Sequence, residues 1–170
     1  MGAVSLKKHA PRAAQLARDG LRIRSALGDA QLAVAHVTAD ALPALAARDP
    51  FDLVVLSCKA YDLDSSIDAI AAAVGPSTAV LPILNGLLHY AALDARFGAD
   101  AVLGGLCFIS AMKGADGEIV HLPSPPSVTF GERDASSNGS ARTRAIEAVC
   151  AGAPGFDAVR SESFMQAAWN

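Results

Sequence analysis

The chain has 170 residues, which is enough for one domain with its own hydrophobic core. Hydrophobic residues make up 52% of the sequence and charged residues 18%, a composition that excludes an intrinsically disordered chain. The formal net charge of −3 gives no reason to expect nucleic acid or an anionic membrane as a partner.

The cysteine pattern and the N-terminal residues both favour the cytoplasm. Cys58, Cys107 and Cys150 lie far apart and lack the spacing of metal ligands. We therefore expect no metal site, and we expect these cysteines to be small buried side chains in a reducing compartment. Residues 1–12 contain no apolar core followed by a cleavage site, and the longest apolar stretch, residues 101–112, is too short to span a bilayer.

The N-terminal part predicts short strands and helices. In chain order we expect a strand tail, a helix, a β-hairpin and a weak helix, over residues 1–6, 11–18, 21–37 and 39–48. Four basic side chains follow the strand tail: Lys7, Lys8, His9 and Arg12. In a nucleotide-binding fold, positive side chains at this place can neutralise the 2′-phosphate of NADP, although a solvated run of charge explains them equally well.

The central stretch, residues 51–86, predicts a βαβ unit. Two apolar runs, residues 52–58 and 78–84, are separated by a helical pattern over residues 61–74, which is typical of two buried parallel strands joined by a helix. Lys59 ends the first strand and Asn85 the second, at the edge where open α/β sheets bind ligands. The pair suits a small anionic or carbonyl-bearing ligand. Spacing alone leaves a simpler interpretation open, in which Lys59 is a solvated strand end and Asn85-Gly86 an ordinary turn.

The remaining residues predict further strands and helices. We expect a strand at 101–110, where Gly104-Gly105 indicates a bend or a close backbone approach, and a hairpin with its turn at Asp116-Gly117. The other expected elements are a helix, a strand, a surface loop, a helix, a strand and a helix, at 88–97, 127–130, 133–140, 141–151, 156–160 and 163–170. The histidines at 36, 89 and 121 have no ligand partner at a useful spacing, so we interpret them as structural or surface side chains.

A family resemblance is carried by the central stretch. Phe51–Leu56 leads to Cys58-Lys59-Ala60-Tyr61-Asp62-Leu63, and Val80–Leu84 leads to Asn85-Gly86-Leu87. Shorter matches are Arg12–Leu16 with Asp19–Ile23, Leu103-Gly104-Gly105, and Asp116-Gly117 followed by Ile119-Val120-His121. In this order, and in register from about residue 4 to residue 169, these elements resemble the ketopantoate reductases (2-dehydropantoate 2-reductases).

The resemblance implies an α/β fold with a Rossmann-like NAD(P)-binding domain. It implies NADPH-dependent reduction of ketopantoate to pantoate in pantothenate and coenzyme A synthesis, with a small 2-keto acid as the substrate. Carried over residue by residue, it implies cofactor contacts from Lys59, Asn85, Ala111 and Arg12, with Lys7 or Lys8 as alternatives to Arg12. Lys59 and Asn85 would also contact the substrate.

Two elements of the family pattern are absent from this sequence. The family begins with a strand and a Gly-x-Gly-x-x-Gly turn that holds the pyrophosphate, and this sequence has no such turn. The family also has a C-terminal helical domain with a general-acid lysine, which we expect beyond Asn170, so no catalytic residue is predicted here. We thus expect residues 1–160 to be a partial NADP-binding domain and residues 161–170 the start of the truncated helical domain.

The missing first strand has two expected consequences. It leaves a neighbouring strand with an open edge, through which the chain could associate, and one face of the sheet uncovered. We also expect little or no turnover from the chain alone. Two alternatives remain: a non-catalytic module that binds a ligand or partner through Lys59 and Asn85, and a reductase of another 2-keto acid.

Overall fold

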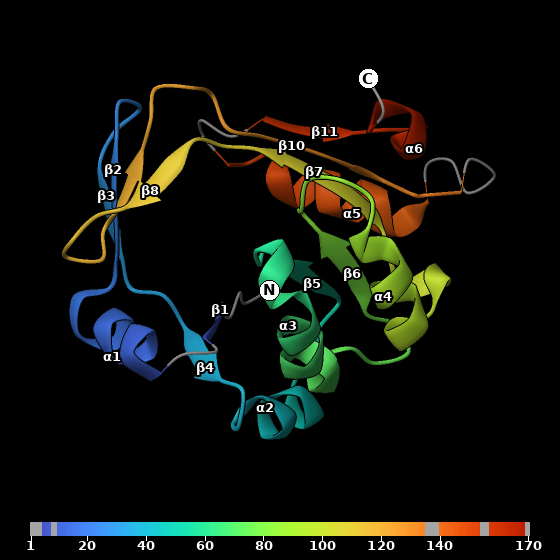
Figure 1. The fold of residues 1–170 in the computed structure, drawn as a ribbon, viewed down its shortest axis with the longest axis horizontal. Coiled ribbons are helices and arrows are strands. Elements are labelled where there is room, and N and C mark those ends of the chain that lie inside the picture. The colour runs from blue at the N-terminus through green and yellow to red at the C-terminus, as the bar shows by residue number, and fades with distance from the viewer. Residues whose placement is uncertain (1–4, 8–9, 135–139, 154–156, 169–170) are drawn as a thin grey trace. The chain divides into compact units, whose positions relative to one another are not determined.

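A computed structural model describes residues 5–7, 10–134, 140–153 and 157–168 (Figure 1). The chain divides into two units. Unit 1 comprises residues 1–49 and 109–124, and unit 2 comprises residues 50–108 and 125–170. We predicted a domain boundary after residue 160, which does not coincide with the limits of either unit, and that boundary stays a prediction.

Unit 1 contains two small sheets and two helices. Its elements are β1 (Ser5–Lys7), α1 (Ala10–Asp19), β2 (Leu21–Ser25), β3 (Ala30–Leu32), β4 (His36–Thr38), α2 (Leu42–Arg48), β8 (Ala111–Lys113) and β9 (Ile119–His121). β1 and β4 form a parallel pair, and the other four strands form one sheet in the order β3-β2-β9-β8. The predicted turn at Asp116-Gly117 is confirmed, because it joins the antiparallel strands β8 and β9 and Gly117 has a φ of 77°.

One predicted strand of unit 1 is wrong. Residues 31–37 were expected to form a single strand of the hairpin with β2, but β3 ends at Leu32 and β4 begins at His36 in the other sheet. The segment between them contains Ala33 and Ala35, whose methyl groups bury too little area to hold it against either sheet. The alternation of apolar residues continues through these alanines, so it conceals the change of partner strand.

Unit 2 contains the central stretch and most of the buried core. Its strands are β5 (Leu53–Leu56), β6 (Ala79–Pro82), β7 (Gly104–Phe108), β10 (Ser127–Gly131) and β11 (Asp157–Arg160). Its helices are α3 (Leu63–Ile70), α4 (His89–Phe97), α5 (Ala141–Cys150) and α6 (Phe164–Ala167), and its 3₁₀ turns are η1 (Ala60–Asp62), η2 (Ala71–Ala73) and η3 (Ala99–Ala101).

The strands of unit 2 run side by side from β5 to β11. β5 pairs with β6 in parallel, and a parallel bridge between Val80 and Val102 leads from β6 to the segment before β7. β7 is antiparallel to β10, and β10 is parallel to β11 (Figure 1). The predicted βαβ unit is therefore present, since η1, α3 and η2 form the connection between β5 and β6.

The core of unit 2 lies between this sheet and α5. It is built from Ala79, Leu81, Leu103, Val128, Phe130 and Ile146. Leu103 and Phe130 are 0% and 1% exposed, and burying a side chain of this size contributes about 1.5–3 kcal/mol. The three cysteines are free and only partly buried, which corrects the expectation of small buried side chains. Burial raises the pKa of the Cys107 and Cys150 thiols, which makes them poor nucleophiles at neutral pH.

The two strands of the βαβ unit differ in burial. All four residues of β6 are buried, as predicted, but in β5 only Leu56 is buried and Val55 is 51% exposed. The prediction of a buried strand is thus wrong for β5. Among the described residues β5 pairs only with β6, so its other edge is open. The open edge was expected from the missing first strand, whereas association through this edge stays a prediction.

Two glycines allow close packing at the centre of unit 2. A Cβ atom on Gly105 would overlap the carbonyl oxygen of Pro82, and a Cβ atom on Gly104 would overlap the ring of Phe164. The backbone N–H of Gly105 donates a hydrogen bond to the Tyr90 hydroxyl at 3.1 Å. The predicted close backbone approach at Gly104-Gly105 is therefore confirmed. None of the described helices is long and apolar enough to cross a membrane.

The close approach at Gly105 predicts a stability effect. Gly105→Ala should lower the free energy of unfolding by about 2–3 kcal/mol, because its methyl group would meet a backbone carbonyl that cannot rotate away. Urea unfolding followed by circular dichroism measures this change. Gly152→Ala is the matched control, since a Cβ atom there has no neighbour within 4 Å, and it should change stability by less than about 0.5 kcal/mol. Equal stability of the two variants would contradict the prediction.

Candidate functional site

Lys59 and Asn85 lie at the same edge of the unit 2 sheet. Leu56 of β5 pairs with Pro82 of β6, and the N–H of Ile83 donates to the carbonyl of Leu56 at 2.9 Å. Lys59 and Asn85 each come three residues after this paired position, and both are exposed. Because the two strands are parallel, their carboxyl ends share one edge. The structure therefore brings together the two residues that the sequence predicted as substrate contacts.

Local backbone structure explains why each strand ends at this point. After β5, the backbone at Lys59 is extended, and its carbonyl accepts the N–H of Asp62 at 2.9 Å to start the η1 turn. After β6, Gly86 has a φ of 87°, a conformation that other residues rarely adopt. This turn allows Asn85 to remain at the edge while the chain enters α4.

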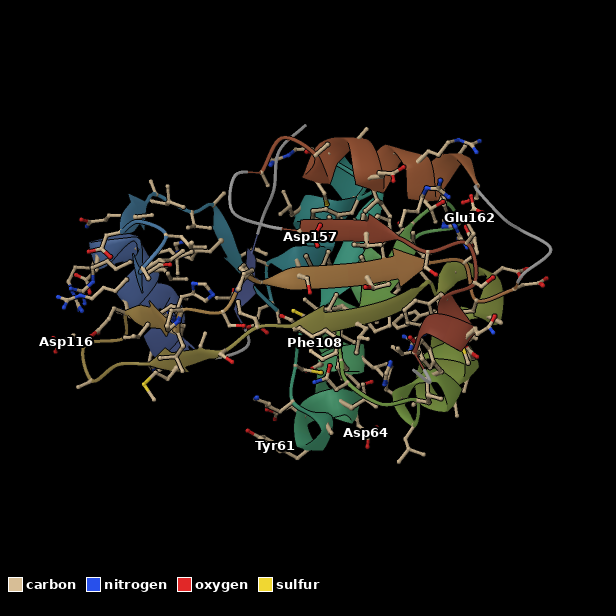
Figure 2. All side chains as sticks on the ribbon, turned by 90° about the horizontal axis from the view of Figure 1, so that it is seen from above. Tyr61, Asp64, Phe108, Asp116, Asp157 and Glu162 are labelled. Atoms are coloured by element: carbon tan, nitrogen blue, oxygen red, sulfur yellow. The ribbon has the colours of Figure 1, made fainter. Side chains whose placement is uncertain are left out.

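Exposed apolar side chains flank the two polar residues. Tyr61, two positions after Lys59, is 85% exposed and projects from η1 (Figure 2). Leu88, three positions after Asn85, is 96% exposed. Large apolar side chains at such exposure are typical of surfaces that a ligand or partner covers when they gather in one place. The edge thus combines one cation and one amide with apolar groups close to them in sequence.

The helix that follows Asn85 is held in place by a long-range network. The guanidinium group of Arg133 donates to both carboxylate oxygens of Asp94 and, at 3.0 Å, to the carbonyl of Val102. The same group lies 4.8 Å from the centre of the Tyr90 ring. Arg133 was predicted at the start of a surface loop, but its side chain is only 17% exposed. It therefore fixes α4 against the segment that leads into β7.

His89, the first residue of α4, is a buried titratable group next to this network. Its side chain is 5% exposed, and its Nε2 atom is buried without a hydrogen-bond partner. Burial lowers the pKa of His89, and the charge of Arg133 lowers it further. The imidazole is thus held in its neutral form. This agrees with the sequence-based interpretation of His89 as a structural residue.

Arg12 and Ala111, the other two predicted cofactor contacts, belong to unit 1. Arg12 donates from one nitrogen to the carbonyl of Gly117 at 2.6 Å and to the side-chain carbonyl of Gln15. Ala111 is exposed at the start of β8 and pairs with His121. Of the alternatives to Arg12, Lys7 is the last residue of β1, and Lys8 lies outside the described residues, as does His9. The cofactor roles of these residues stay predictions.

Sequence reasoning missed the residues that support the edge. The contact between Arg133 and Asp94 joins positions 39 apart, and no local pattern indicates it. The hydrogen bond between Gly105 and the Tyr90 hydroxyl was equally hidden, although the adjacent glycines indicated that something approaches closely. Among the described residues, no group of three or more His, Cys, Asp or Glu side chains is placed to hold a metal ion.

Comparison with known families identifies the group of proteins that this chain resembles. A family model described as ketopantoate reductase PanE/ApbA matches residues 3–135. The chain is 33% identical over 141 residues to a Bacillus subtilis (strain 168) protein called uncharacterized oxidoreductase YkpB, a match that covers 83% of this chain and 44% of that relative. These matches confirm the predicted family resemblance.

Solved structures support the same fold. The crystal structure of 2-dehydropantoate 2-reductase from Geobacter metallireducens GS-15 is 28% identical with a TM-score of 0.73, and the match covers 89% of this chain and 48% of that one. A structure of D-mandelate dehydrogenase with NADH and anilino(oxo)acetate is 18% identical with a TM-score of 0.77, and covers 98% of this chain and 51% of that one. The second likeness is one of fold alone. The chain spans about half the length of these relatives.

The buried His89 predicts a pH dependence of stability. Because its pKa in the folded chain is below the ordinary value of 6.5, stability is full above pH 6.5 and falls as the pH drops from 6.5 through the folded pKa. The slope is at most about 1.4 kcal/mol per pH unit for one proton. Urea unfolding at a series of pH values between 5 and 7.5 measures it.

A leucine at position 89 removes the titrating group from this site. His89→Leu should flatten the pH dependence between pH 5 and 7, and at pH 7 it should cost little, because it also removes an unpaired buried nitrogen. His36→Gln, which replaces a half-buried histidine of unit 1, is the matched control for the loss of an imidazole. An unchanged slope in His89→Leu would show that other groups cause the dependence.

Proposed function

Because the chain belongs to the ketopantoate reductase PanE/ApbA family of oxidoreductases, we propose that it takes part in the NADPH-dependent reduction of 2-dehydropantoate to pantoate. The observation that carries the proposal is the pair of exposed polar side chains, Lys59 and Asn85, at the carboxyl ends of two adjacent parallel strands. We place this reaction in pantothenate and coenzyme A synthesis in the cytoplasm.

The chemistry of the two side chains fits a nicotinamide and a 2-keto acid. Asn85 carries a donor and an acceptor in one amide, which matches the carboxamide of a nicotinamide. Lys59 carries a positive charge and up to three donors, which matches the carboxylate or the carbonyl oxygen of the substrate. When bound, the cofactor supplies a hydride to the carbonyl carbon of the substrate. Lys59 would then stabilise the negative charge that develops on the carbonyl oxygen.

The surroundings of the pair favour a ligand with a flat apolar part. Tyr61 and Leu88 follow the two polar residues closely and expose apolar surface, and an aromatic ring of a ligand gains by covering such surface. Figure 2 shows Tyr61 projecting away from the ribbon, where its phenol ring is accessible. In the proposal, Ala111 of β8 lines the cofactor as well.

We choose NADPH over NADH because of the basic side chains near the N-terminus. Arg12, or Lys7 or Lys8 in its place, would neutralise the 2′-phosphate that distinguishes the two cofactors. D-mandelate dehydrogenase, which shares the fold, holds NADH in its structure. The fold therefore does not determine whether NADH or NADPH binds, and particular side chains select the cofactor.

The length of the chain decides how the proposal is tested. Since it spans about half of its relatives, ligand binding is measured separately from turnover. Calorimetric titrations with NADPH, NADH and 2-dehydropantoate test binding, and loss of NADPH absorbance in the presence of 2-dehydropantoate tests turnover. We expect NADPH to bind more tightly than NADH.

Lys59→Ala tests the role of the proposed substrate contact. Because it removes a charged hydrogen-bond donor, it should raise the dissociation constant for 2-dehydropantoate by about tenfold or more, with the folded state unchanged since the side chain is exposed. Arg144→Ala removes an exposed positive charge from α5 of the same unit and should leave binding as in the wild type.

Three outcomes of these titrations, extended to other 2-keto acids, would count against the proposal. Wild-type chain that binds neither NADPH nor 2-dehydropantoate would favour a non-catalytic partner-binding module. Equal weakening by Lys59→Ala and Arg144→Ala would point to diffuse electrostatic attraction. Tighter binding of another 2-keto acid than of 2-dehydropantoate would reassign the substrate while retaining the reaction.

A further inference from the structure

A pocket of about 670 Å³ lies within unit 1, among α1, the β2–β3 hairpin and the turn between β8 and β9. It is lined by Gln15, Arg18, Asp19, Arg22, Gln31, Lys113, Ala115, Asp116 and Gly117. All of these residues belong to the same unit. None of these lining residues is used by the proposed function, although Arg12, a proposed cofactor contact, holds the adjacent turn.

Side chains from α1 and β2 fix one wall of the pocket. Arg12 donates to the carbonyl of Gly117 at 2.6 Å, while Gln15 and Arg22 donate to the carbonyl of Asp116 at 3.2 and 2.7 Å. A Cβ atom on Gly117 would overlap the side-chain amide of Gln15, so the turn packs directly on α1. A turn held by three side chains gives the pocket a preformed shape.

The charges that face the pocket leave an excess of cation. Arg18 and Asp19 form a bidentate ion pair at 2.9 and 2.8 Å, which neutralises both. Asp116 lies at the tip of the hairpin (Figure 2) and lines the pocket, and its backbone carbonyl is the atom that Arg22 contacts. The lining residues thus carry three cations, Arg18, Arg22 and Lys113, and two carboxylates, Asp19 and Asp116, which leaves one positive charge in excess for a ligand.

Arg22 has an unused hydrogen-bond donor. Its Nε atom is buried and has no partner, whereas one terminal nitrogen is held by the turn. Because a buried donor without an acceptor is unfavourable, an acceptor supplied by a ligand would stabilise the site. Arg22 also lines a second hollow of about 350 Å³, together with Glu118, and its charge interacts with that of Asp19.

We propose that this pocket binds the phosphate group of a small phosphorylated molecule. The planar guanidinium fork of Arg22 matches two phosphate oxygens, and Lys113 adds a second positive charge for the dianion. The volume exceeds that of a phosphate ion and lies within the range of small-molecule sites, so the pocket also accommodates the organic part of the molecule. The side-chain amides of Gln15 and Gln31 provide polar contacts for a polyol.

Titration of the full chain with inorganic phosphate and with glycerol 3-phosphate tests the proposal. Nuclear magnetic resonance follows the Nε–H signal of Arg22, which should shift and saturate with either probe and stay unchanged with glycerol or with potassium chloride at equal ionic strength. Tighter binding of glycerol 3-phosphate than of phosphate would identify a phosphorylated metabolite as the ligand. Equal binding would identify free phosphate.

Three variants separate a built site from general attraction of anions. Lys113→Gln, whose side chain is exposed and so does not support the fold, should weaken binding about tenfold, and Arg22→Gln should do the same. Arg24→Gln removes the same charge from β2 but does not line this pocket, and it should bind like the wild type. Absence of saturation, or equal weakening by Arg24→Gln and Lys113→Gln, would overturn the proposal.

Discussion

The parallel pairing of β5 with β6 is the interaction on which the candidate site depends. It is tied at both ends, since the Ala79 N–H donates to the carbonyl of Asp52 at 2.9 Å and the Ile83 N–H to the carbonyl of Leu56 at 2.9 Å. The buried hydroxyl of Thr78 adds a bond to the carbonyl of Phe51 at 2.7 Å. A slip of this pair by one residue would move Lys59 relative to Asn85 and turn the strand side chains to the opposite face.

The stability of this pair comes mainly from β6. All of β6 is buried in the unit 2 core, whereas β5 contributes one buried side chain and is held by its pairing with β6. The strand end that carries Lys59 is thus less constrained than the strand end that carries Asn85. A site built on one buried strand and one exposed strand tolerates changes at Val55 far better than changes within β6.

The sequence predicted those parts of the fold that depend on local pattern. The apolar runs, the glycine turns and the shared edge of Lys59 and Asn85 follow from strand periodicity and from the rule that parallel strands end together. The burial of β5 was overestimated because burial depends on what covers a face, which Val55 itself does not encode. The division of residues 31–37 between two sheets was missed for a related reason, since β4 pairs with a distant strand.

The supporting contacts of both units could not be predicted. Arg133 reaches Asp94 across 39 positions, and Arg22 reaches Asp116 across 94. An arginine in a polar segment looks the same whether it is solvated or bound to a carbonyl far along the chain. The sequence was therefore sufficient to predict the pair Lys59 and Asn85 on adjacent strands. It was not sufficient to predict the network that holds α4, the helix after Asn85, in place.

The pairing of β2 with β9 determines when unit 1 can fold. Ile23 pairs with Ile119, and the Ser25 hydroxyl is hydrogen-bonded to His121 across 96 positions. Closing a loop of this length costs about 4 kcal/mol of chain entropy, and at a synthesis rate of about 5–20 residues per second β2 waits roughly 5–20 s for its partner. During that interval the β2–β3 hairpin is marginally stable by itself. Unit 1 is thus complete only when the β8–β9 hairpin, which is synthesised last, pairs with β2. Its assembly is therefore a long-range and comparatively slow event.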